Sequence, residues 1–174
     1  MSPLFGRRRP PIRVERGERL LAHATTAEGD VVGGTRDALY AVRRLGTALA
    51  LEETIRIPWE DVQSADWDQE AEVLRVIEVG SWGAVRPEHA FRLQEPALLL
   101  QLVRERVTAS VVLQRHVAIN GARGVRVIAR RAPRGDRPVQ WVYEYDEGVD
   151  PDDPAVQRAA EAALVAARVD LGTP

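Results

Sequence analysis

The hydrophobic pattern of this chain changes its period near residue 95, and this change limits the folds that the chain can adopt. Between residues 19 and 93, apolar and β-branched residues occur in short runs separated by polar or glycine-containing turns. Seven strands are predicted, at 19–26, 31–35, 38–44, 53–58, 62–68, 73–79 and 89–93. Their spacing of about ten residues is typical of an antiparallel sandwich or barrel.

After Pro96 the apolar residues follow helical spacing, which predicts one long helix. Its apolar face comprises Leu98, Leu99, Leu102, Val103, Val107, Val111 and Val117. Asn120 and Gly121 are typical of a helix end, so we expect the helix to end there. Seven strands leave an apolar interior with an open end, which the helix would cover.

The last third of the chain predicts two strands and a second helix. The strands, 125–131 and 139–145, flank a polar loop at 132–137. Asp153 and Pro154 are typical of a helix start. The helix that follows should bury a stripe of small and apolar residues, which are Val156, Ala160, Ala163, Leu164 and Ala167. This stripe is too small to stand alone, so the helix must dock on the rest of the protein.

The predicted fold class is therefore α+β. It consists of a seven-stranded antiparallel barrel or sandwich capped by a long helix, followed by a ββα extension. The basic, proline-rich residues 1–16 are expected to be disordered. Residues 17–120 form the predicted main domain, and 121–174 form the extension, packed on that domain or next to it.

Two short stretches resemble the bacterial pleckstrin-homology (PH) and GRAM domains, whose fold has seven strands followed by a helix. Residues 31–40 (VVGGTRDALY) are similar to a strand–turn–strand of these domains, in which a threonine and a polar pair precede an apolar pair. Residues 57–62 (IPWEDV) are similar to their step between the fourth and fifth strands. The whole chain also looks like a protein family of high-GC bacteria.

The resemblance covers residues 17–118 and implies a PH-like fold with a binding or scaffolding role. It supplies no catalytic residues. Members of the family that bind phosphoinositides carry basic residues between the first two strands, whereas the turn at 28–30 is acidic here. The resemblance therefore does not extend to phosphoinositide binding.

Composition excludes several chemistries. The chain has 24 arginines, no lysine and no cysteine, so it lacks a Walker A lysine, a Schiff-base nucleophile, a thiol nucleophile and disulfides. The three histidines lie far apart in sequence, and we predict neither a metal site nor a cofactor. No secretory signal or membrane span is recognisable, so we expect a cytoplasmic protein.

One group of arginines is the main candidate binding site. Its members are Arg123, Arg126, Arg130, Arg131, Arg134 and Arg137. In a strand, Arg126 and Arg130 would share a face and could grip a phosphate through paired hydrogen bonds. The alternative is a solvated face paired with nearby acids such as Glu144. The net charge of −2 argues against broad nucleic-acid affinity.

These observations favour a non-enzymatic interaction or scaffold module. We expect a protein or peptide partner at a sheet edge or beside a helix, with Trp82 as a candidate anchor, although a core role for Trp82 is the alternative. Binding of nucleic acid or a membrane surface through the arginines is a second possibility, and an enzyme of unrecognised type is a third. The strand at 138–145 is a candidate for pairing with its own copy in a homodimer.

Overall fold

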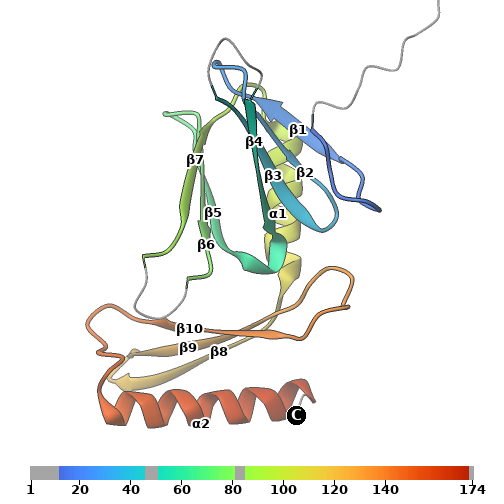
Figure 1. The fold of residues 1–174 in the computed structure, drawn as a ribbon. Coiled ribbons are helices and arrows are strands. Elements are labelled where there is room, and N and C mark those ends of the chain that lie inside the picture. The colour runs from blue at the N-terminus through green and yellow to red at the C-terminus, as the bar shows by residue number, and fades with distance from the viewer. Residues whose placement is uncertain (1–11, 46–50, 81–84, 173–174) are drawn as a thin grey trace, which may run out of the picture. The chain divides into compact units, whose positions relative to one another are not determined.

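The computed structural model describes residues 12–45, 51–80 and 85–172, and it divides the chain into two compact units, 1–106 and 107–174. Unit 1 contains seven strands and most of the first helix (Figure 1). The strands are β1 (Ala22–Thr25), β2 (Val31–Gly34), β3 (Ala38–Leu45), β4 (Leu51–Pro58), β5 (Val62–Asp68), β6 (Val73–Glu78) and β7 (Glu88–Arg92). All seven predicted strands are confirmed, with ends shifted by three residues at most.

The sequence allowed a barrel or a sandwich, and the described strands do not form a closed barrel, because they form two separate sheets. The first is antiparallel with the order β1-β2-β3-β4, and the second is antiparallel with the order β5-β6-β7. A short 3-10 helix, Trp59–Asp61, interrupts the chain between β4 and β5. Among the described residues, one isolated bridge, between Thr25 and Gln94, joins the two ends of the strand series.

Two sequence motifs, 31–40 and 57–62, meet in the core of unit 1 through residues that are 24 positions apart. The indole of Trp59 is fully buried, and its Nε1 donates a hydrogen bond to the carbonyl oxygen of Thr35 at 3.1 Å. The Thr35 hydroxyl accepts hydrogen bonds from the backbone N–H groups of Asp37 and Ala38, which fixes the turn between β2 and β3. A Cβ on Gly34 would lie 2.7 Å from Cδ2 of Leu102 and 3.2 Å from the ring of Trp59, so a larger residue here would displace Leu102.

The N-terminal segment, residues 12–20, lies on the opposite face of the first sheet. Ile12 is 1% exposed and packs with Val31, Tyr40 and Val42, supported by the partly buried Val14. We expected residues 1–16 to be disordered. Residues 1–11 lie outside the described residues, but the apolar surface of the sheet orders the chain from Ile12 onward.

The first helix, α1 (Ala97–Ser110), ends ten residues earlier than expected. It begins directly after Pro96, as predicted, and buries Leu99, Leu102 and Val103. Leu98, which was assigned to the apolar face, is 74% exposed. The division between the units falls within α1, whereas the sequence placed the domain boundary at 120.

Residues 111–120, predicted as the end of the helix, form a strand instead. Side chains in β8 (Val111–Asn120) alternate strictly between half-buried and exposed, which is the period of a strand. Asn120 and Gly121 do not end a helix. They begin the tight turn into β9 (Arg123–Arg130), where Gly121 has a left-handed φ of 64°.

Unit 2 is a three-stranded antiparallel sheet with one helix on one face (Figure 1). The strand order is β10-β9-β8, with β10 (Gln140–Tyr145) at one edge. The helix α2 (Pro154–Leu171) packs mainly against β8 and β9. Its predicted stripe is confirmed, because Val156, Ala160, Ala163 and Ala167 are buried, and Leu164 packs beside them.

Candidate binding surfaces

The six candidate arginines lie on β9 and in the segment that follows it. Arg126 and Arg130 lie on the central strand β9, with side chains on the same face of the sheet, as expected from their spacing. Arg123 is at the other end of β9 from Arg130, about 23 Å away along the strand. Arg131, Arg134 and Arg137 are exposed and belong to the segment between β9 and β10.

Arg126 faces an acid on the neighbouring strand. Its Nη1 lies 3.3 Å from Oε2 of Glu144, its direct partner in the β9–β10 register. Pairing with Glu144 is the alternative to a phosphate site that the sequence allows, and the structure shows this pairing for Arg126. Arg130 is buried, and its Nη1 donates to the Ser110 hydroxyl at 3.0 Å. Burial lowers the pKa of Arg130, while the charge of Glu144 acts in the opposite direction.

A second polar pair lies next to Arg126. Nε2 of His116 is 2.8 Å from Oδ2 of Asp146, and the same carboxylate oxygen accepts a hydrogen bond from the backbone N–H of Gly124. The hydrogen bond from His116, followed by that from Gly124, lowers the pKa of Asp146. The carboxylate of Asp146 is therefore held by His116 of β8 and the backbone of β9.

The acidic segment between β10 and α2, residues 146–153, ends at the helix cap. Asp153 caps α2 by accepting a hydrogen bond from the N–H of Ala155 at 2.7 Å.

In unit 1 a polar cluster around Glu18 fastens the N-terminal segment to the first sheet. One Glu18 carboxylate oxygen accepts from the Thr35 hydroxyl at 2.6 Å and from the Tyr40 hydroxyl at 3.0 Å. The other forms an ion pair with Arg56. Burial lowers the pKa of Arg56, but hydrogen bonds to Glu18 and Tyr40 outweigh it and raise this pKa above its usual range. Burial also raises the pKa of Tyr40.

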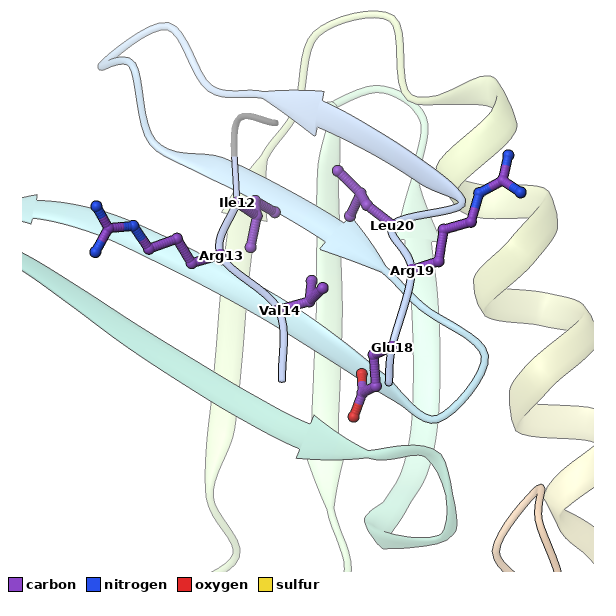
Figure 2. Close-up of a pocket in the computed structure, with 6 residues that line it drawn as sticks. All are labelled: Ile12, Arg13, Val14, Glu18, Arg19 and Leu20. Carbon is purple, nitrogen blue, oxygen red and sulfur yellow. The ribbon is translucent and has the colours of Figure 1, made fainter. Parts of the chain in front are cut away.

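A pocket of about 540 Å³ opens within the N-terminal segment (Figure 2). It is lined by Ile12, Arg13, Val14, Glu18, Arg19 and Leu20. Figure 2 shows the side chains of Arg13 and Arg19 extending to opposite sides, away from each other. Because the Glu18 carboxylate is held by the sheet, the pocket offers an incoming molecule mainly apolar contacts.

The outer face of α2 carries apolar residues that our sequence interpretation missed. We define this face by Ala155, Arg158, Ala162, Val165 and Val169, all of which are exposed. Val165 is 63% exposed and Val169 is 75% exposed, although the opposite side of the same helix is already buried against the sheet. The signal was present in the sequence, because these positions recur at intervals of three and four residues.

Two opposite charges lie on one flank of this face. Glu161 and Arg168 are seven residues apart and exposed. Both act on the pKa of Tyr143 in β10, which burial raises; Glu161 raises it further and Arg168 lowers it. This places both charges on the side of α2 nearest β10. Among the ion pairs of the described residues, neither side chain takes part in one.

Trp82, the candidate anchor for a partner, lies outside the described residues. Nε2 of His89 is hydrogen-bonded to Oε1 of Glu78 at 2.6 Å, and Nε2 of His116 is hydrogen-bonded to Oδ2 of Asp146. Each of these two histidines therefore already has a carboxylate partner. In the described ranges there is no cluster of three or more histidine, aspartate or glutamate side chains with metal-site geometry.

Searches found no protein-family model and no curated protein that matches this sequence. In the part of the chain that the structure describes, no helix combines the length and apolarity needed to cross a bilayer.

Proposed function

We propose that this protein is a non-enzymatic interaction module whose protein partner docks on the outer face of α2. The observation that carries this proposal is the exposure of Val165 and Val169 on a helix whose other side is already buried. Single exposed apolar residues are common on protein surfaces, but a contiguous apolar face is typical of an interaction site. Apolar residues on both sides of a helix are typical of one packed from both sides.

We further infer that unit 1 has a PH-like arrangement and serves as a scaffold. The order of four strands, three strands and a helix supports this inference, as does the contact of Trp59 with Thr35, which joins the two motifs that carry the resemblance. The lack of cysteine fits a reducing compartment, in keeping with a cytoplasmic location.

The saturation of the polar clusters supports a role without catalysis. General acid–base catalysis needs a titratable group that can reach a substrate proton. Both carboxylate oxygens of Glu18 are engaged by groups of the same unit, and its exposed fraction is only 4%. Arg126 and Asp146 are likewise engaged by Glu144 and His116.

Site-specific photocrosslinking in cells tests this proposal. A photoreactive phenylalanine derivative placed at position 165 or 169 should form covalent adducts with a protein. The same probe at position 98, an equally exposed leucine on α1, is the matched control and should form none. The proposal is overturned if positions 165 and 169 give no adduct, or if position 98 gives the same adducts.

A further inference from the structure

We propose that the partner on the outer face of α2 is a second copy of this chain, and that two α2 helices pack antiparallel across a two-fold axis. This inference rests on the proposed function of that face. Four apolar residues and one arginine follow the three-and-four spacing of a helix–helix seam, in the order Ala155, Arg158, Ala162, Val165 and Val169. The seam runs along almost all of α2, a helix about 27 Å long.

Small side chains along the seam allow two helices to approach closely. Ala155 and Ala162 lie on the seam, and Ala159 and Ala166 flank it on the side away from Glu161 and Arg168. Interhelical distances shorten when the side chains at the contact are small. A second α2 therefore fits this face better than a bulky, irregular surface does.

The charges determine the direction of packing. Glu161 and Arg168 occupy equivalent positions, one heptad apart, on the same flank of the seam. In an antiparallel pair the same flank of both helices comes together, whereas in a parallel pair each flank meets the opposite one. Only the antiparallel pair brings these charges face to face, because the opposite flank carries Ala159 and Ala166.

One register makes the charges complementary. When Ala162 of one copy lies opposite Val165 of the other, Glu161 faces Arg168 of the other copy, and the two-fold axis repeats this ion pair. In the same register Arg158 lies opposite Val169, in the last turn of the other helix, where the helix dipole favours a cation. Glu161 and Arg168 thus gain in the dimer the ion pairs that they lack in the described chain.

A single helix pair is a small interface. Stable complexes bury about 1,200–2,000 Å² in total, and smaller interfaces are typical of transient association. We therefore expect a dimer that depends on protein concentration. Analytical ultracentrifugation of the full chain over a wide concentration range should show a monomer–dimer equilibrium.

Charge reversal tests the register. Glu161→Arg alone and Arg168→Glu alone should each shift the equilibrium to monomer, because like charges then meet across the axis. An equimolar mixture of the two variants should dimerise again, because each chain then presents the charge that the other lacks. Leu98→Glu, an exposed substitution in unit 1, should leave the wild-type equilibrium unchanged.

Four outcomes separate this inference from the function on which it rests. Restored association in the mixture supports the antiparallel pair. A wild-type chain that stays monomeric at all concentrations overturns it, and so does dimerisation that the single charge reversals leave unchanged. If the chain is monomeric but position 165 still crosslinks to a different protein, a second copy of the chain is not the partner, and the proposed interaction role stands.

Discussion

Two apolar surfaces of this protein are treated in opposite ways. The outer face of the sheet β1–β4 carries Val31, Tyr40 and Val42, and the chain covers it with its own N-terminal segment. The outer face of α2 carries Val165 and Val169, and no described segment covers these residues. Burial of apolar surface stabilises a fold at about 25 cal/mol per Å². Unit 1 obtains this stabilisation within the chain, whereas we propose that the face on α2 obtains it from a partner.

Polar contacts show the same difference. Glu18 joins the N-terminal segment to Arg56, Tyr40 and Thr35. The segment is therefore held on the sheet by an ion pair and hydrogen bonds as well as by apolar contacts. On α2, Glu161 and Arg168 flank the exposed face and face solvent. The covered surface with its bonded polar groups is a structural element, whereas the uncovered one, flanked by Glu161 and Arg168, is the docking surface that we propose.

The largest expected effect comes from placing a charge under the cover of the sheet. Ile12→Asp buries an unpaired carboxylate and should lower the free energy of unfolding by more than about 3 kcal/mol. Arg13→Asp, one residue away and exposed, and Val165→Asp, on the uncovered face in the middle of α2, should each change it by less than about 0.5 kcal/mol. Urea denaturation of the dilute, monomeric chain measures all three. An equal loss for Ile12→Asp and Val165→Asp would remove the contrast between the two surfaces.

A smaller effect is expected when the polar fastening is removed. Glu18→Gln leaves Arg56 without its closest counter-charge in a largely buried position and should cost about 2 kcal/mol. Hydrogen exchange should increase in residues 12–20. The control is Glu15→Gln, because the Glu15 carboxylate is exposed and lies 3.4 Å from Arg56. Similar effects of the two substitutions would show that Glu18 does not fasten the segment.

At the start of α2, removing the capping side chain should lower the free energy of unfolding by about 1 kcal/mol. Asp153→Ala removes the side chain that accepts from the N–H of Ala155, and loss of such a cap destabilises by about that amount. Asp152→Ala serves as the control, since Asp153 is the residue that caps the helix. Thermal unfolding followed by circular dichroism compares them, and a lower melting temperature is expected only for Asp153→Ala.

The weakest expected effect is the pH dependence contributed by Asp146. Its pKa is lowered by the hydrogen bonds from His116 and Gly124, so the folded state favours the carboxylate. Its contribution to stability is therefore complete above the unfolded value of about 3.9 and is lost as the pH falls through the lowered pKa. A carboxyl NMR titration should place Asp146 below that value, and His116→Phe should move its midpoint upward. An unchanged midpoint would contradict the assignment.

Periodicity predicted most of the fold. The seven strands of unit 1, the start of α1, the last two strands and the inner stripe of α2 all follow from local alternation or helical spacing. The end of α1 was wrong because Val107, Val111 and Val117 fit helical spacing, while Val111, Leu113 and Val117 also fit a strand. The Asn120–Gly121 pair favours a hairpin turn as strongly as a helix end.

The proposed binding surface was harder to predict. The arginine group stood out by composition, but β8 and β10 flank β9, and the register brings Glu144 opposite Arg126. The sequence allowed pairing with Glu144 as the alternative, but only the strand register shows that Arg126 is the arginine opposite it. The outer face of α2 was missed for a different reason. Its spacing is visible, but only burial of the inner stripe shows that a second apolar face is left over.

Disulfide trapping tests the antiparallel pair most directly, because the chain contains no cysteine of its own. We predict that a mixture of Arg158→Cys and Val169→Cys chains forms a mixed disulfide dimer under mild oxidation, since these positions lie opposite each other in the proposed register. Neither variant alone should crosslink, because like positions are then about 16 Å apart along the helices, beyond the roughly 7 Å that a disulfide spans. Crosslinking of Val169→Cys with itself, without the mixed species, would contradict the account.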